Sequence, residues 1–214
     1  MKPIFIAILV ICAAGSSYGK LRCDVGSSNV ATEWLDMTAG CIDKVRHQIQ
    51  TEINASMMYL AMAAHFSQDT VNRPGFAEFF FHSASEEREH AMKLIEYLLM
   101  RGEFKTSADY AAVGELMQVN VPVLPPLVSG VAALEQALKA ETFVTKSIKD
   151  VIETCERDND KNDYHLVDYL TAEFLDEQYK GQRDLAGKIS TLQKMMKTES
   201  SAALGEFLFD KQLL

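Results

Sequence analysis

The chain of 214 residues carries 30 acidic and 21 basic side chains, a net charge of −9, and 48% hydrophobic residues. This composition fits one globular domain with a sizeable core, and it excludes collagen-like, disordered and disulfide-dense chains. The acidic excess disfavours binding to nucleic acid or to anionic membranes and favours the attraction of cations.

The N-terminal residues have the pattern of a secretory signal peptide. Lys2 precedes an apolar run at residues 4–14, and small residues occupy the −3 and −1 positions of a cleavage site after Gly19. The run is about half the ~20 residues that a membrane span needs, which argues against a permanent anchor. We therefore predict a signal peptide at residues 1–19, a secreted protein without a membrane span, and a weakly patterned extension at residues 20–38.

Four long segments after this extension have the periodicity of amphipathic helices. The chain has only five prolines, and its long stretches without proline favour such helices. Short polar turns join the first segment to the second and the third to the fourth. The segments span residues 41–68, 74–101, 128–157 and 164–190, and a short last helix is expected at residues 200–209.

Residues 102–126 contain two glycines and three prolines and show no sustained period. A loop of this length is unusual in a compact domain, but it is long enough to cross the whole length of a helical bundle. The pattern predicts an all-α protein, a four-helix bundle with one long crossover loop and a short fifth helix. An up-and-down bundle with a long middle loop and a helical interaction module remain as alternatives.

Each predicted helix carries polar side chains at mid-length on its apolar face, where an unpaired carboxylate costs several kcal/mol. One pair forms a Glu-x-x-His motif, whose members are neighbours on a helix. Counted along the bundle, these groups spread over only ~10 Å, so they converge at one level in either topology. The set comprises Glu52, Tyr59, Glu87, His90, Glu141 and Gln178.

Three carboxylates and one imidazole in a core favour a metal site. Hard oxygen ligands with one nitrogen suit iron or manganese and do not suit structural zinc. A symmetric di-iron bundle has two Glu-x-x-His motifs, but the second histidine is missing here, and Gln178 stands where another carboxylate is expected. Fewer anionic ligands should hold a second ion loosely, which suits a site that passes metal on. The predicted ligands are Glu52, Glu87, His90 and Glu141.

Several short strings in these segments resemble animal ferritin. They are SEEREHA at residues 85–91, KNDYHL at 161–166, DEQ at 176–178 and EFLFDK at 206–211. With its leader and its extra cysteines, the chain is most similar to the heavy-type subunit of secreted insect ferritins. The resemblance implies a ferritin-like di-iron domain over residues 39–214 with the ferritin-like bundle fold. It also implies a ferroxidase that oxidises Fe(II) with O₂ and stores ferric mineral in a hollow shell.

The resemblance assigns roles to the polar set. It implies two irons per centre, the first held by Glu52, Glu87 and His90, and the second bridged by Glu87 and completed by Glu141. The tyrosine and the glutamine of the set line the site. The family assembles as twenty-four subunits, and for this chain the resemblance implies a shell mixed with light-type subunits.

Two further groups of acidic residues match the family in part. Glu86 and Glu89 match inner-surface acids that are associated with mineral nucleation, although Met92 replaces a common glutamate. Asp168 matches one of two acids of the three-fold channel, whereas the second position is Thr171. The resemblance therefore indicates the route by which iron enters the shell less clearly than it indicates the metal centre.

Two rival functions can be weighed against the ferroxidase. A structural shell subunit without catalysis would not need the intact set of predicted ligands. A ferritin-like di-iron oxygenase acting on an organic substrate would be expected to carry the second Glu-x-x-His motif, which is missing. The sequence thus favours an iron-storage ferroxidase over both.

Three cysteines remain after the leader, and their pairing depends on the topology. If the long loop crosses the bundle, the first helix starts where the third ends, and Cys41 and Cys155 become neighbours. In an up-and-down bundle they would lie ~40 Å apart. We expect a Cys41–Cys155 disulfide within the chain and a bond from Cys23 to another subunit, most simply a light-type one. Three unpaired thiols are the alternative.

Overall fold

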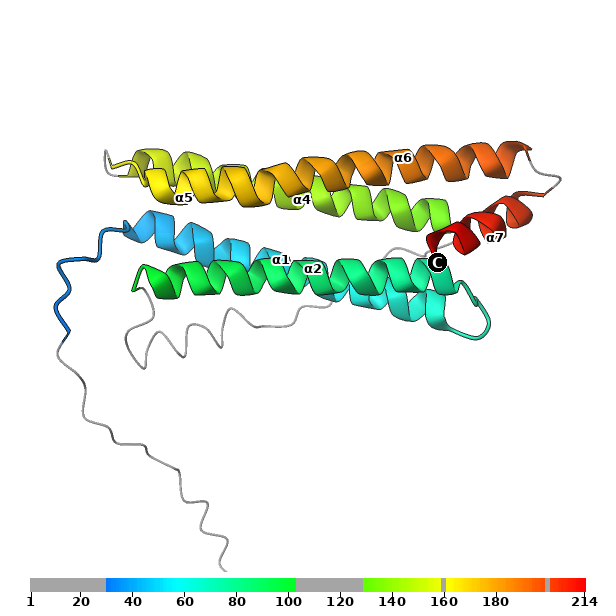
Figure 1. Cartoon of the computed structure of the whole chain (residues 1–214), viewed down its shortest axis with the longest axis horizontal. Helices are drawn as coiled ribbons and strands as arrows, with labels where there is room; N and C mark the ends of the chain where they lie inside the picture. Colours follow the sequence, from blue (N-terminus) through cyan, green and yellow to red (C-terminus); the bar gives the residue numbers. More distant parts are fainter. Residues whose placement is uncertain (1–29, 103–128, 159–160, 199–200) are drawn as a thin grey trace, which may run out of the picture. The chain divides into compact units, whose positions relative to one another are not determined.

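The described residues, 30–102, 129–158, 161–198 and 201–214 of a computed structural model, form helices and no strand (Figure 1). The long helices are α1 (Ala39–Ser67), α2 (Pro74–Met100) and α4 (Gly130–Arg157). A fourth rod consists of α5 (Tyr164–Tyr169), the π-helical segment η2 (Leu170–Leu175) and α6 (Asp176–Thr198), and α7 (Ala202–Leu213) follows it. α1 packs on α2 and α4, α4 packs on α6, and α7 contacts both α2 and α6. The predicted helical fold is confirmed.

Local capping explains where the helices begin. The side chains of Thr38, Ser129, Asp163 and Ser201 accept hydrogen bonds from backbone N–H groups in the first turns of α1, α4, α5 and α7. Pro74 occupies the first turn of α2, where its missing N–H is not needed. The bounds predicted for the first three helices accordingly differ from the observed ones by two residues at most.

The fourth rod differs from its prediction in length and in winding. It continues to Thr198, eight residues beyond the predicted end, and contains a π-helical segment. A period of 3.6 residues counted back two turns from Phe174 puts Val167 on the buried face, but the structure buries Leu166 and Leu170 together with Phe174. Steps of four residues exceed the 3.6 residues of an α-helical turn, and the wider π-helical turn accommodates them.

The helix α7 shows that α2 and α4 run parallel. Its Glu206 accepts a hydrogen bond from the N–H of Gly130 at 2.9 Å, and its Asp210 accepts one from the N–H of Phe76 at 3.0 Å. The N-termini of α4 and α2 therefore lie at the same end of the bundle, where carboxylates stabilise them. The crossover topology is thereby confirmed, although the connection itself, residues 103–128, lies outside the described residues.

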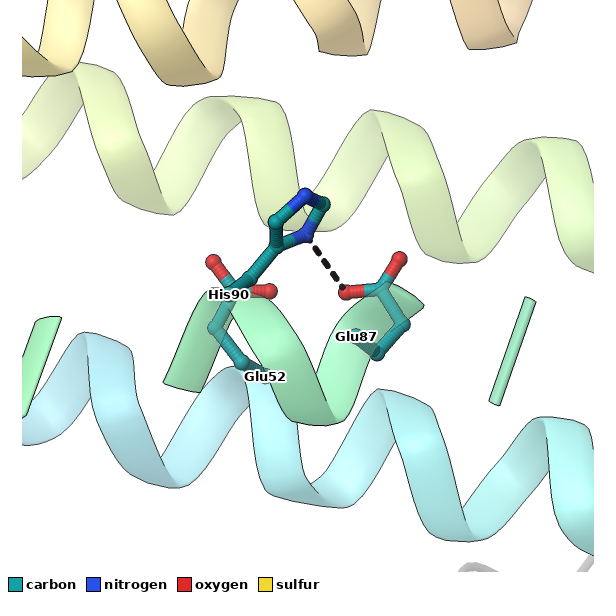
Figure 2. Close-up of side chains that lie close together, drawn as sticks. All are labelled: Glu52, Glu87 and His90. Carbon is teal, nitrogen blue, oxygen red and sulfur yellow. Dashed lines mark ion pairs between the residues drawn. The ribbon is translucent and has the colours of Figure 1, made fainter. Parts of the chain in front are cut away.

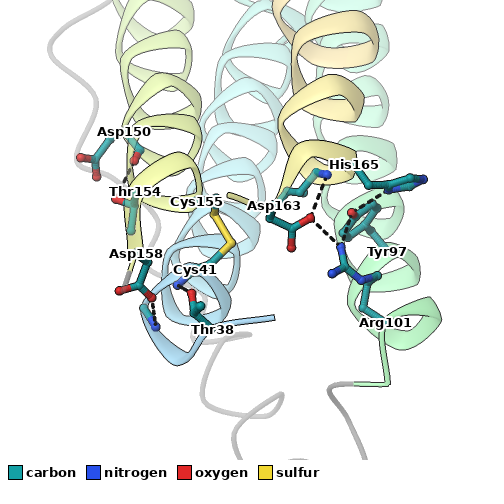
Figure 3. Close-up of a disulfide and its surroundings, with 12 residues drawn as sticks. Thr38, Cys41, Tyr97, Arg101, Asp150, Thr154, Cys155, Asp158, Asp163 and His165 are labelled. Carbon is teal, nitrogen blue, oxygen red and sulfur yellow. Dashed lines mark hydrogen bonds and ion pairs between the residues drawn. A yellow bond between two sulfur atoms is a disulfide. The ribbon is translucent and has the colours of Figure 1, made fainter. Parts of the chain in front are cut away.

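A disulfide at the opposite end supports the same topology. Cys41 at the start of α1 is bonded to Cys155 near the end of α4, with their Cα atoms 4.9 Å apart (Figure 3). Close by, the N–H of Gly40 donates to Asp158 at 3.1 Å. This arrangement excludes an up-and-down bundle, in which the two cysteines would be at opposite ends. Cys23 lies outside the described residues, so its pairing stays a prediction.

The last residues before α1 have neither helix nor strand, but they are held at this end of the bundle. Arg101, at the end of α2, donates to Asp163 at 2.9 Å (Figure 3). The same guanidinium donates to Asp36, among the residues before α1, at 2.5 Å. It also donates to the hydroxyl of Tyr97 at 2.7 Å, and that hydroxyl lies 2.9 Å from Nδ1 of His165. One guanidinium thus joins the residues before α1 to the ends of α2 and α5.

The core consists of two apolar clusters along the bundle. One is built from residues 41–55 of α1, 91–98 of α2, 144–155 of α4 and 166–174 of the fourth rod. The other uses residues 58–66, 76–84, 133–137 and 185–192 of the same rods, with Phe209 of α7. The predicted polar set falls at or next to the boundary between the clusters on every rod. None of the described helices is long and apolar enough to cross a membrane.

Replacing Gly75 with alanine should displace α7. A Cβ atom at this position would lie 1.9 Å from the backbone oxygen of Asp210, a contact that only a backbone shift can relieve. We expect the free energy of unfolding to fall by about 1–3 kcal/mol, as for other overpacked sites. Gly187→Ala is the control, since its Cβ would meet only Arg183 at 3.8 Å. Denaturant unfolding of both variants measures the difference, and equal stabilities would contradict the close packing of α7.

Candidate metal centre

The bundle consists of four helical rods, which are α1, α2, α4 and the continuous rod from α5 to α6. They bring the predicted polar set together at mid-length. Glu52 comes from α1, Glu87 and His90 from α2, Glu141 from α4 and Gln178 from the first turn of α6. All five are buried, and the side chain of Glu52 is completely shielded from solvent. Ionisable side chains are rarely so buried without a partner, so this cluster calls for a chemical explanation.

Three of these residues form the tightest group. One possible ligand atom from each of Glu52, Glu87 and His90 lies within 4.8 Å of the others (Figure 2). Nδ1 of His90 is 3.6 Å from Oε2 of Glu87, and Figure 2 shows Glu52 reaching from α1 toward the pair on α2. The Glu-x-x-His spacing places two of the groups on one face of α2, and the packing of α1 on α2 supplies the third.

Glu141 and Gln178 lie outside this group of three but border the same cavity as Glu87 and His90, which has a volume of about 420 Å³. The hydroxyl of Tyr59 donates to Oε1 of Glu141 and so holds that carboxylate in place. The hydroxyl of Thr145 donates to Oε1 of Gln178 at 2.8 Å. The structure therefore places a third carboxylate and a neutral amide beside the three-residue group.

The site is crowded with acidic groups. Burial, followed by the neighbouring charge of Glu87, raises the pKa of Glu52 well above its usual value. Burial and the charge of Glu141 likewise raise the pKa of Glu87. Burial and the same carboxylate raise the pKa of the Tyr59 hydroxyl. A bound cation would offset both the burial of these charges and their mutual repulsion, and it would displace protons from the carboxylates.

The unpartnered atoms of the site fit a metal ion. Oε2 of Glu52, Oε2 of Glu87 and Nδ1 of His90 are buried, and none has a hydrogen-bond partner among the described residues. Buried polar atoms in folded proteins are nearly always satisfied, so three orphans in one cluster indicate a missing partner. Two carboxylate oxygens and one imidazole nitrogen form a donor set that suits Fe(II).

Sequence reasoning missed the residues around the ligands. Oε2 of Glu177 lies 3.2 Å from Nε2 of His90, so the second ring nitrogen faces a carboxylate. Gln182 donates to the hydroxyl of Thr145, which in turn holds Gln178. Gln48 donates to Glu52 and could have been found from its position one turn earlier on the same face. The other contacts link different rods, and spacing along one helix does not reveal them.

The other acidic residues to which the resemblance assigned a role are exposed to solvent. Glu86 borders the cavity and is 3.1 Å from Nδ1 of His82. Glu89 is 3.6 Å from Lys93, and Asp168 is exposed on α5. These positions leave the roles of Glu86 and Glu89 in nucleation and of Asp168 in a channel as predictions.

The fold and the buried carboxylate–histidine cluster define a metal-binding four-helix bundle with a crossover. Residues 42–195 match the ferritin family profile, described as a ferritin-like domain. The chain is 57% identical over its whole length to the ferritin heavy chain of Papilio xuthus, covering 98% of it. It is 49% identical to that of Drosophila melanogaster over the full length of both. The chain therefore belongs to the ferritin family.

A solved structure extends this similarity to three dimensions. The crystal structure of Trichoplusia ni secreted ferritin matches with a TM-score of 0.83 and 58% identity, over 90% of this chain and 97% of the other. The predicted secreted localisation is confirmed by this likeness, although residues 1–19 lie outside the described residues. Membership in the heavy-chain group makes the protein a ferroxidase of an iron-binding family, and it implies assembly into a shell.

Proposed function

We propose that this chain oxidises Fe(II) in pairs at the buried cluster and that its ferric product passes to the interior of the shell. Glu52, Glu87 and His90 bind the first Fe(II), and Glu87 bridges to a second that Glu141 completes. O₂ takes electrons from both ions. The observation that carries this proposal is the set of three buried donor atoms that have no hydrogen-bond partner in the described part of the chain and converge from α1 and α2.

The second iron should be held more loosely than the first. Glu141 already accepts a hydrogen bond from Tyr59 through one oxygen, and the neutral Gln178 stands where a further carboxylate would add charge. A weakly held ion exchanges readily, so the product can leave and fresh Fe(II) can bind. This supports treating iron as the substrate of the site rather than as its permanent cofactor.

The assembly we propose is a shell of twenty-four subunits that includes light-type partners. Cys23 is the residue through which this chain would bond to a light-type subunit. Inside the shell, Glu86 and Glu89 would bind ferric ions as they leave the centre. Their support is that both are exposed on α2 next to Glu87 and that Glu86 borders the cavity of the centre.

Aerobic addition of Fe(II) to the assembled protein tests this function against its rivals. The mass of the particle is measured before and after the addition, and oxidation is followed over time. A ferroxidase of a storage shell should oxidise Fe(II) rapidly and retain iron far beyond two ions per subunit. Slow oxidation would favour a structural subunit, and retention of only two ions per subunit would favour an oxygenase.

The channel role of Asp168 predicts a dependence on salt. Asp168→Asn should slow iron uptake by roughly 10-fold at low ionic strength, because acidic groups at a pore concentrate cations. The difference should shrink at 0.15 M salt, where the Debye length falls to about 8 Å. Asp69→Asn, at an exposed turn near the other end of the bundle, is the control. Equal uptake by Asp168→Asn and the parent at low salt would direct attention to another pore.

A further inference from the structure

Gln48 is a buried amide whose presence packing alone does not explain. Its side chain is 1% exposed in a part of α1 that otherwise contributes apolar residues such as Val45 and Ile49 to the core. Burying an amide is unfavourable unless it makes hydrogen bonds, so an apolar side chain would serve the core better. Oε1 of Gln48 has no partner among the described residues. The bond that its Nε2 makes is therefore the feature to explain.

That bond goes to a predicted ligand. Nε2 of Gln48 donates to Oε1 of Glu52 at 2.8 Å, within a pair that is wholly buried. This hydrogen bond distinguishes the two oxygens of the Glu52 carboxylate, since Oε1 accepts it while Oε2 has no hydrogen-bond partner among the described residues. A carboxylate anchored through one oxygen cannot rotate freely, and its other oxygen keeps a defined direction.

The other members of the site are held in the same manner. Nε2 of His90 faces Glu177 at 3.2 Å, while Nδ1 has no hydrogen-bond partner among the described residues. Oε1 of Glu141 is held by the hydroxyl of Tyr59. Outer partners of this kind orient metal ligands, and replacing them typically lowers metal affinity or activity by 10–100-fold.

We propose that Gln48 is a positioning residue of the centre, whose amide holds Oε1 of Glu52 so that Glu52 offers only Oε2 to the metal. The inference rests on the proposed role of Glu52 as a ligand. Without the amide, the carboxylate of Glu52 can turn and bind through either oxygen or both. Fe(II) should then bind more weakly, while the residues that take part in oxidation remain in place. The effect should therefore fall on KM more than on kcat.

Gln48→Met tests this inference because methionine has a similar length and lacks the donor. The chain offers a matched control in Gln50→Met: Gln50 lies on the same helix and makes the same kind of bond, from Nε2 to Oδ1 of Asn54 at 2.8 Å. Assembled shells of each variant are titrated without oxygen with Co²⁺, whose visible absorption reports the ligand geometry. Fe(II) oxidation is then measured over a range of iron concentrations.

We expect Gln48→Met to bind Co²⁺ about 10–100-fold more weakly with an altered spectrum, and to raise KM with kcat nearly unchanged. Gln50→Met should behave as the parent does. Gln48→Leu, which also lacks the donor, replaces Gln48→Met if the latter fails to assemble. Parental Co²⁺ affinity and spectrum in Gln48→Met or Gln48→Leu would overturn the inference.

A variant of Glu52 itself separates this inference from the proposed function. Glu52→Gln should abolish the Co²⁺ spectrum of the centre if Glu52 is a ligand. Should Glu52→Gln leave the spectrum unchanged, the ligand assignment itself fails, and the positioning role of Gln48 falls with it. If Glu52→Gln abolishes the spectrum and the Gln48 variants retain it, the ligand assignment stands and only the positioning role is overturned.

Discussion

Replacing Glu87 with lysine and His90 with glycine should abolish rapid Fe(II) oxidation while the shell still assembles. Both side chains are buried at the centre, and each contributes a donor atom to which the described residues offer no hydrogen-bond partner. A charged lysine offers donors only and repels Fe(II), and glycine removes the only nitrogen of the donor set. Loss of an outer partner alone lowers activity by 10–100-fold, so we expect the initial rate to fall by more than about 100-fold.

This double variant also changes the charge of α2, so a control for the charge is needed. Glu96→Lys reverses the charge at an exposed position further along the same helix and should oxidise Fe(II) at the parental rate. Initial rates are read from the absorbance of the ferric product, and size-exclusion chromatography reports assembly. An unchanged rate in the Glu87→Lys, His90→Gly variant would rule out this centre.

Replacing both Cys41 and Cys155 with serine should lower the free energy of unfolding of the subunit by about 2–5 kcal/mol. The disulfide joins residues 114 positions apart, so it restricts the unfolded chain strongly. It also ties the start of α1 to the end of α4, the two helices that supply Glu52 and Glu141. Denaturant unfolding of the variant and of the parent, with and without a reductant, measures the effect.

The parent in reductant serves as the control, because it should unfold at the same denaturant concentration as the double-serine variant. A variant as stable as the oxidised parent would show that the disulfide adds no stability. Peptide mapping without reduction completes the test by locating Cys23, which should be linked to another subunit. A bond from Cys23 to Cys41 or to Cys155 within one chain, or a free thiol at Cys41, would contradict the pairing.

Helix existence and most helix bounds could be predicted because their causes are local. N-caps such as Thr38 and Ser129 start helices by accepting hydrogen bonds from backbone N–H groups three residues further on. The end of α6 could not be predicted in this way. Its last turns include the buried Leu192, and they are held by α7, where a Cβ on Gly205 would lie 2.7 Å from the backbone of Met195. Contacts between separate helices therefore decide where this rod ends.

The π-helical segment η2 shows a second limit of the sequence pattern. A period of 3.6 residues predicts Val167 on the buried face, whereas Leu166, Leu170 and Phe174 occupy it. The spacing of Leu166 and Leu170 alone does not show whether these leucines or Val167 face the core, because that depends on the neighbouring helices. Both α5 and η2 contact α4, and the wider π-helical winding keeps the side chains at these four-residue steps on the buried face.

The sequence by itself determined the chemical groups of the centre and their heights along the bundle, because helical spacing converts residue number into position. It left the topology open, since both bundles place the polar set at mid-length. Only the tertiary structure decided that α2 and α4 run parallel, through the bonds of α7 and the disulfide. It also decided which atom of each ligand is free, because partners such as Glu177 are brought to their ligands by packing between rods.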